Sequence, residues 1–245
     1  MSLLSGCVRL SLTNPPAPGW LIKRAGAAGG AHIRAGGNGE HLRRRDYLQR
    51  RREGEPISAL FLANGAESVT LGFSRQWSDP LPGRPFRFGG AARPTEPACA
   101  AGMLQAIARI VSEVGLVGLN SADFLVRENA FDLLEINPRP GATLDIYRHT
   151  ELFRLHVEAC HGQLPSPALT FSGAAACTVV YAPHAFELTA DFPWPDWAAD
   201  RQSPGPVVKD APFCTVIAEA EEITMSQELV ARRKAEVLAI AGSTS

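Results

Sequence analysis

The stretch SADFLVRENAFDLLEINPRPG, residues 121–141, constrains the fold more than any other part of the sequence. It consists of two strand-like runs around a polar turn, a pattern typical of a β-hairpin. Successive side chains of a strand point to opposite faces, so Glu135 and Asn137 share one face. The other face collects the apolar side chains Ala122, Phe124, Val126, Leu134 and Ile136, and we expect that face to be buried.

The length of the turn sets which residues of this hairpin face each other. A three-residue turn, Glu128 to Ala130, pairs Arg127 with Phe131 and places Asp123 opposite Glu135. Directly opposed residues have Cβ atoms about 4.5–5.5 Å apart. We therefore expect the carboxylates of Asp123 and Glu135 to be neighbours on the polar face.

Two carboxylates about 5 Å apart repel each other by roughly 3 kcal/mol at an effective dielectric constant of 20. A divalent cation would compensate this repulsion, and Asp123, Glu135 and Asn137 offer the hard oxygen donors that Mg²⁺ or Mn²⁺ prefers. The alternative is a solvated acidic face in which Asn137 caps the turn. The hairpin alone leaves both interpretations open.

Composition places the chain among ordinary globular proteins. Its 245 residues are 45% hydrophobic and 20% charged, and the formal net charge of −1 provides no general attraction to nucleic acid or to a membrane. Five scattered cysteines without a CxxC pair favour reduced thiols in the cytoplasm over a disulfide framework or a zinc site. No apolar run approaches the roughly 18 residues that span a bilayer.

The order of patterns along the chain predicts an α+β fold in two units. PISALFLANG and ESVTLGFSRQW form a hairpin around an Asn-Gly turn, residues 80–97 form a loop, and ACAAGMLQAIARIVSEVG forms a helix. A second helix is expected at about 145–161, and a last one near 226–241. The linker GQLPSPALTFSG separates a first domain, residues 1–165, from a small β-rich domain, residues 166–245.

A glycine-rich loop, KRAGAAGGAH, follows a short apolar strand near the start of the chain. It matches neither the Walker pattern nor the GxGxxG fingerprint. It does offer Lys23 at a strand end, followed by Gly26, Gly29 and Gly30, whose exposed amides can fold over phosphate oxygens. A flexible surface turn is the alternative interpretation of this loop alone.

Three segments in order resemble the ATP-grasp superfamily, and more closely its carboxylate-amine ligases. They are WLIKRAGAAGGAH, YLQRRREGEPISALFLANG and GLNSADFLVRENAFDLLEINPRPG, which together span residues 20–141. The resemblance implies an ATP-grasp fold, with the later residues similar to the small β-rich domain that closes some of these ligases.

The resemblance also implies roles for individual residues. Lys23 and Arg139 are implied as catalytic residues that balance phosphate charge, and Mg²⁺ or Mn²⁺ is implied at Asp123, Glu135 and Asn137. The implied ATP-contacting set consists of Lys23, the flap glycines Gly26, Gly29 and Gly30, the hinge residues Gln49, Arg50, Arg51 and Arg52, and Glu55 as a substitute for the ribose-binding acidic residue.

The sequence departs from the family in two places. Pro56 stands where many relatives have the acidic residue after the hinge, and no segment resembles the preceding α/β domain with its first ATP-contacting lysine. We therefore expect the 245-residue chain alone to bind nucleotide weakly and to turn over little. A homodimer or a complementing N-terminal subunit would complete the site.

The implied activity is an ATP- and Mg²⁺-dependent ligase that joins a small-molecule carboxylate to an amine through an acyl-phosphate. The alternative is a non-catalytic nucleotide-binding or subunit-interaction protein derived from such a ligase. The arginine-rich segment RRRDYLQRRREGE is interrupted by acidic residues and lacks an aromatic platform, so we expect a solvated strand face or an anion-facing hinge rather than a nucleic-acid site.

Overall fold

The computed structural model describes residues 10–11, 19–27, 29–30, 32–36, 41–148, 151–167 and 169–243. Three antiparallel sheets, of four, eight and two strands, and three α-helices form the described part, which confirms the predicted α+β class. Within this part, no helix combines the length and the apolar character needed to cross a membrane. Four of the five cysteines lie in it, and all four are free thiols.

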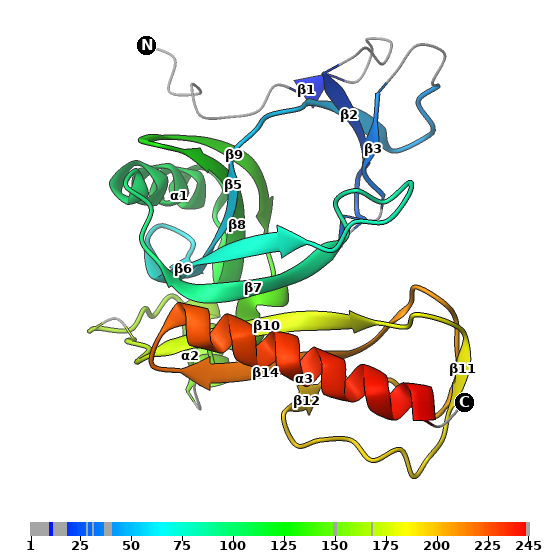
Figure 1. The fold of residues 1–245 in the computed structure, drawn as a ribbon. Helices are drawn as coiled ribbons and strands as arrows, with labels where there is room; N and C mark the ends of the chain where they lie inside the picture. Colours follow the sequence, from blue (N-terminus) through cyan, green and yellow to red (C-terminus); the bar gives the residue numbers. More distant parts are fainter. Residues whose placement is uncertain are drawn as a thin grey trace.

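The smaller sheet is built from the first part of the chain (Figure 1). Its strands pair in the order β1-β4-β2-β3. The buried Asp46 holds this sheet together, because its carboxylate accepts hydrogen bonds from Arg34 at 2.9 Å and from the backbone of Arg43 at 3.1 Å. The strands are β1 (Leu10–Ser11), β2 (Trp20–Arg24), β3 (Arg34–Ala35) and β4 (Asp46–Arg50).

The larger sheet has eight strands in the order β12-β14-β10-β7-β6-β5-β8-β9. The predicted Asn-Gly hairpin is confirmed as β5 and β6, where the Asn64 side chain accepts hydrogen bonds from the backbone of Ala66 and Glu67. The strands are β5 (Glu55–Asn64), β6 (Ser68–Ser78), β7 (Phe88–Thr95), β8 (Val117–Arg127), β9 (Ala130–Asn137), β10 (Ala174–Tyr181), β12 (Ala198–Ala199) and β14 (Pro212–Ala220). A separate pair consists of β11 (Phe186–Leu188) and β13 (Gly205–Val207).

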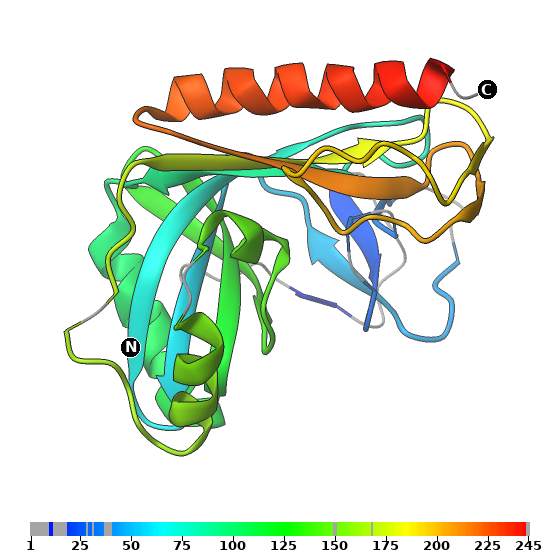
Figure 2. The same cartoon turned by 90° about the horizontal axis from the view of Figure 1, so that it is seen from below.

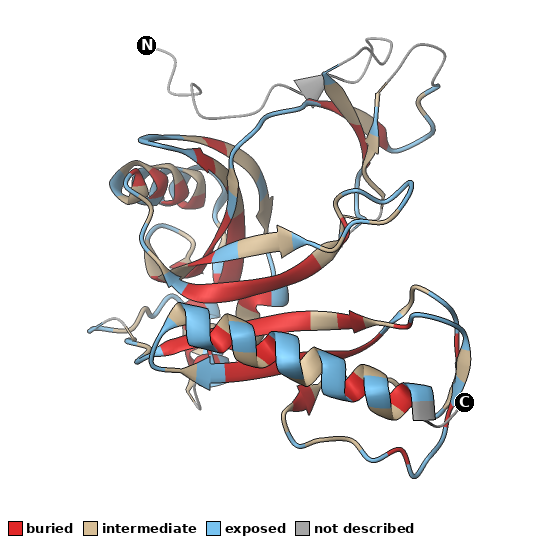
Figure 3. Cartoon of the chain, viewed as in Figure 1, coloured by how far each residue is buried: buried red, intermediate tan, exposed pale blue. Residues whose placement is uncertain are grey.

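Helices cover both faces of the larger sheet. The chain contains α1 (Ala100–Val114), the 3-10 helix η1 (Ala142–Ile146), α2 (Leu152–Cys160) and α3 (Ile223–Ser243). Helix α3 lies along β10 and β14, and η1 and α2 pack on the opposite face (Figure 2). Buried residues alternate with exposed ones along α3, as expected for a helix with one side on a sheet (Figure 3).

The helix predictions are confirmed in part. Helix α1 ends at Gly115, whose φ of 74° is the left-handed conformation that favours glycine at a helix end. The single helix expected at about 145–161 is wrong, because η1 ends at Ile146 and α2 begins only at Leu152. The chain leaves the helical conformation at Tyr147, whose ring is fully buried and packs edge-on against Phe171 at 5.2 Å.

The prediction of a loop at residues 80–97 is wrong as well, because residues 88–95 form β7. Gly89 and Gly90 suggested a loop, but here they permit close packing inside the sheet. A Cβ atom on Gly90 would stand 2.2 Å from the carbonyl oxygen of Cys177 and 2.4 Å from the Trp77 ring. The glycines of this segment therefore make room for a neighbouring strand and an indole.

The strands after residue 166 continue the larger sheet. Strand β10 pairs with β7 through Ala175 to Thr178, opposite Arg93 to Gly90. Strand β14 pairs in turn with β10, and α3 covers both. The division into domains at residues 165 and 166 stays a prediction. The larger sheet contains strands from both sides of this boundary.

We expect Gly90→Ala to destabilise the protein by about 1 to 3 kcal/mol, because the added methyl group meets backbone and ring atoms that cannot both move aside. The matched control is Gly242→Ala, where nothing lies within 4 Å and where alanine stabilises a helix by up to about 1 kcal/mol. Urea unfolding of the two variants measures the difference. Equal midpoints would contradict the packing role of Gly90.

Candidate functional site

The hairpin of β8 and β9 places Asp123 opposite Glu135, which confirms the predicted pair. The turn that leads to this register is shorter than expected. The turn contains only Glu128 and Asn129, so Arg127 pairs with Ala130, and the predicted pairing of Arg127 with Phe131 is wrong. A β-bulge between Asp123 and Phe124 restores the register.

The bulge also changes which leucine faces the core, although both leucines are only partly buried. Leu133 packs against the core beside Phe124 and Ile136, where Leu134 had been expected. Leu134 instead lines a large cavity, and its carbonyl oxygen accepts a hydrogen bond from Gln49 at 3.0 Å. Since Gln49 lies on β4, the bulged residue joins the smaller sheet to the larger one.

Asp123 is the most heavily hydrogen-bonded carboxylate of this face. Its two oxygens accept from the amides of Gln76 at 3.2 Å and Asn137 at 3.0 Å, and Ser58 lies directly opposite on β5. Burial raises the pKa of the Asp123 carboxyl, the hydrogen bonds oppose the rise, and the charge of Glu135 adds to it. The pKa stays above its usual range, because burial disfavours the charged form of the carboxyl more than the hydrogen bonds favour it.

Glu135 is balanced by a lysine from the other sheet. The Lys23 ammonium lies 3.3 Å from the Glu135 carboxylate, and the lysine side chain is only 6% exposed, against 43% for the glutamate. A buried ammonium needs a partner, because removal from water is costly. The ion pair therefore supplies positive charge at the same place where the two carboxylates repel.

A cavity of about 750 Å³ lies between the two sheets and collects most of the predicted residues. Gly26 is an exposed residue outside the lining, and Glu55 forms an ion pair with Arg75. The predicted residues that line the cavity are Lys23, Gly29, Gly30, Gln49, Arg50, Arg51, Arg52, Asp123, Glu135, Asn137 and Arg139.

The glycine loop closes one side of this cavity. Gly29 and Gly30 both have φ of 71°, and a Cβ atom on Gly30 would stand 1.7 Å from the Phe86 carbonyl oxygen. The backbone of Phe88 donates a hydrogen bond to the Gly29 carbonyl at 3.2 Å. The loop is therefore docked on the segment that leads into β7.

The hinge residues Arg51 and Arg52 make contacts within the protein, whereas Arg139, which follows β9, is exposed. The Arg51 backbone N–H donates to the Gly19 carbonyl at 2.8 Å, and the Arg52 guanidinium lies 3.7 Å from the buried Asp132. Arg139 is exposed and points its guanidinium toward the Asn137 amide oxygen at 3.5 Å. Its other terminal nitrogen donates to the Pro140 carbonyl at 3.1 Å, so both terminal nitrogens make local contacts.

Among the residues that the structure describes, no group of three or more His, Cys, Asp or Glu side chains could hold a metal ion. A cation at the hairpin would therefore depend on two carboxylates and the Asn137 amide, with the remaining positions filled by phosphate oxygens and water. His156, four residues before Cys160 on α2, accepts a hydrogen bond from the Leu119 backbone at 2.9 Å.

Sequence reasoning missed three residues of this site. Ser58, Gln76 and Thr143 line the cavity with the predicted set. Ser58 interrupts the otherwise apolar run of β5, and this polar position was the available signal. Thr143 carries a buried hydroxyl without a hydrogen-bond partner among the described residues.

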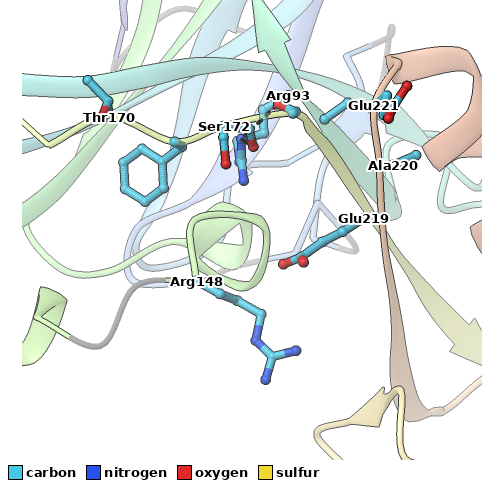
Figure 4. A pocket seen from close by; sticks show the side chains of 10 residues that line it. Arg93, Arg148, Thr170, Ser172, Glu219, Ala220 and Glu221 are labelled. Carbon is cyan, nitrogen blue, oxygen red and sulfur yellow. Dashed lines mark hydrogen bonds between the residues drawn. The ribbon is translucent and has the colours of Figure 1, made fainter.

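A second cavity, of about 490 Å³, lies at the opposite ends of β7, β10 and β14 (Figure 4). The buried guanidinium of Arg93 donates to the carbonyl oxygens of Ile146 and Gly173 and lies over the Tyr147 ring, 5.5 Å from its centroid. Figure 4 shows Arg93 beside Ser172, whereas Arg148 points away from it. Arg93 therefore anchors η1, the segment whose first residues line the larger cavity.

The sequence of this chain is similar to one known protein family. The family described as ATP-grasp domain matches residues 8–143, more than half of the chain. Among curated proteins, no sequence matches this chain.

Solved structures share the fold at low sequence identity. The biotin carboxylase of Campylobacter jejuni, in a β,γ-ATP complex, has a TM-score of 0.66 and 12% identity, over 91% of this chain and 61% of its own. The N5-carboxyaminoimidazole ribonucleotide synthetase of Thermotoga maritima has a TM-score of 0.65 and 11% identity, over 94% and 67%.

A third structure is the biotin carboxylase domain dimer of the Hydrogenobacter thermophilus 2-oxoglutarate carboxylase, with MgADP, ADP and bicarbonate. Its TM-score is 0.64 and its identity 15%, over 90% of this chain and 56% of its own. The chain thus spans 56 to 67% of the lengths of these three proteins. The likeness confirms the predicted fold.

The ion pair between the sheets is testable by a double-mutant cycle with Lys23→Met and Glu135→Gln. We expect a coupling energy of about 0.5 to 1 kcal/mol, because the glutamate is partly solvated, and a smaller value in high salt. The exposed pair Arg109 and Glu113 is the control, with about 0.3 kcal/mol. Zero coupling between Lys23 and Glu135 in urea unfolding would contradict the contact.

Proposed function

The chain belongs to the ATP-grasp family, and on that premise we propose that it is an ATP- and Mg²⁺-dependent ligase that joins a carboxylate to an amine. The observation that carries the proposal is the arrangement of Lys23, Glu135 and Asp123 at one cavity between two sheets. Two opposed carboxylates and a buried lysine within hydrogen-bond distance are suited to hold a metal-bound polyphosphate.

The residues present fit a divalent cation. Asp123, Glu135 and the amide oxygen of Asn137 would hold it, and all three are hard oxygen donors on one face of the hairpin. When bound, the ion neutralises phosphate charge and orients the phosphoryl group for transfer. The Asn137 amide, which now donates to Asp123, would have to present its oxygen instead.

Lys23 is suited to change partners during binding. Its ammonium now contacts Glu135, and a cation at Glu135 would release it toward phosphate oxygens in the same cavity. The backbone amides of Gly29 and Gly30 are placed to cover those oxygens, and Gln49 with the hinge at Arg50 to Arg52 borders the space for the adenine.

The reaction that we propose runs through an acyl-phosphate. The γ-phosphoryl group of ATP would pass to the substrate carboxylate and release ADP; the amine would then attack the acyl carbon, expel inorganic phosphate and lose a proton to form the amide. Arg139, exposed at the cavity, would balance charge on the transferring group. The protein would act by positioning and charge neutralisation, since phosphoryl transfer requires little covalent help.

Two further features belong to the proposal. A homodimer or a complementing N-terminal subunit is part of the proposal, because the similar biotin carboxylase domain of Hydrogenobacter thermophilus is a dimer. The four free cysteines favour the reducing environment of the cytoplasm.

Calorimetric titration with a non-hydrolysable ATP analogue, with and without Mg²⁺, tests the proposal. We expect Mg²⁺ to increase the affinity at least tenfold, and Glu135→Gln to abolish most of this gain because it removes one metal-facing charge. Glu113→Gln, at an exposed position of α1, is the matched control and should bind like the wild type. Equal weak binding with and without Mg²⁺ would refute the metal site. Mg²⁺-dependent binding without ADP formation from any carboxylate and amine pair would favour a non-catalytic nucleotide-binding protein.

A further inference from the structure

The part of the large cavity that lies away from the hinge is lined by rings. Phe86 and Phe88 border it from the start of β7, Tyr181 borders it from the end of β10, and Trp77 lies at the end of β6. Val179, Pro85 and Pro212 complete this part of the lining, and Ser78 is its polar member. We refer to Phe86, Phe88 and Tyr181 as the ring wall.

The position of the ring wall relative to the hinge identifies which ligand it would meet. The hinge at Arg50 to Gly54 leads into β5, which pairs with β8, whereas the ring wall lies across β6 on β7 and β10. Between the two stands the glycine loop, whose Gly29 carbonyl accepts from the Phe88 backbone at 3.2 Å. A nucleotide with its adenine at the hinge and its phosphates under the loop therefore ends where the ring wall begins.

Tyr181 is held by two contacts, and its hydroxyl is already engaged. The Tyr181 hydroxyl donates to the Phe88 carbonyl at 2.7 Å, and the Arg87 guanidinium lies over the tyrosine ring, 3.7 Å from its centroid. Arg87 is held by the Asp79 carboxylate at 3.2 Å, and Lys234 contacts the same carboxylate at 3.3 Å. Tyr181 thus presents ring surface to the cavity rather than a hydrogen-bonding group.

We propose that one of the two substrates carries an aromatic ring, which packs against Phe86, Phe88 and Tyr181 while its carboxylate or amine reaches the phosphate end at Arg139. The inference rests on the proposed ligase function and names the class of its substrate. Aromatic rings prefer edge-on or offset partners, and the exposed ring surfaces of this wall favour an apolar ligand over a small polar one. A substrate with a small polar body would leave this surface solvated.

Matched probes test the proposal and show which substrate bears the ring. Phenylacetate is compared with acetate, and phenylethylamine with ethylamine, by saturation-transfer NMR on the full chain with Mg²⁺ and the ATP analogue. We expect one of the two ring-bearing probes to bind at least tenfold more tightly than its small counterpart, since a pocket that buries several methylene equivalents discriminates by about 10- to 100-fold. The same ranking is expected in kcat/KM for ADP formation.

Two variants separate the ring wall from the nucleotide site. Tyr181→Ala and Phe86→Ala should each reduce the preference for the ring-bearing probe about tenfold and leave binding of the Mg²⁺-ATP analogue unchanged. Unchanged nucleotide binding also serves as the test that each variant is folded. Phe153→Ala removes a ring that is 78% exposed on α2 and should change neither measurement.

Each outcome decides the matter. Loss of the preference in either variant with intact nucleotide binding supports the proposal. Equal binding of ring-bearing and small probes in the presence of bound analogue overturns it and leaves the ligase function standing. Absence of analogue binding in the wild type overturns the proposed function, and this inference with it.

Discussion

The opposed carboxylates of Asp123 and Glu135 are the constraint on which the rest of the site depends. Groups from other strands offset this repulsion. The Lys23 ammonium from the smaller sheet pairs with Glu135, and the Gln76 amide from β6 donates a hydrogen bond to Asp123. The same contacts hold the two sheets together, since Gln49 also reaches the β9 backbone at Leu134. The contacts that balance the charge of the carboxylate pair therefore also help to assemble the cavity.

The hairpin of β8 and β9 shows how far the sequence could predict the site. The predicted opposition of Asp123 and Glu135 holds because two deviations from the expected hairpin cancel: the turn is one residue shorter, and the bulge at Leu134 adds one residue to β9. The turn and the core-facing leucine were predicted wrongly, since a two-residue turn and a bulge end in the same register as a three-residue turn. A bulge leaves little trace in a hydrophobic pattern, so Leu133 and Leu134 could not be told apart.

Other features depend on which strands become neighbours, and local patterns do not contain that information. Gly89 and Gly90 indicate a loop until Trp77 and the Cys177 carbonyl are known to approach them. Gln76 is 47 residues from Asp123 in sequence, and the two meet because β5 lies between β6 and β8. The helix break at Tyr147 likewise follows from packing against Phe171 rather than from helix propensity.

Strand order also assigns different parts of the cavity to different parts of the chain. The hinge, the glycine loop and the carboxylate pair come from β2, β4, β8 and β9, which lie within residues 20–137. Tyr181 comes from β10, and its hydroxyl bonds to Phe88 across the pairing of β10 with β7. Residues after 166 therefore complete the wall beyond the glycine loop but contribute nothing to the carboxylate pair. Substitutions on β10 can change which substrate fits this wall while the charges that would hold a metal-bound nucleotide stay in place.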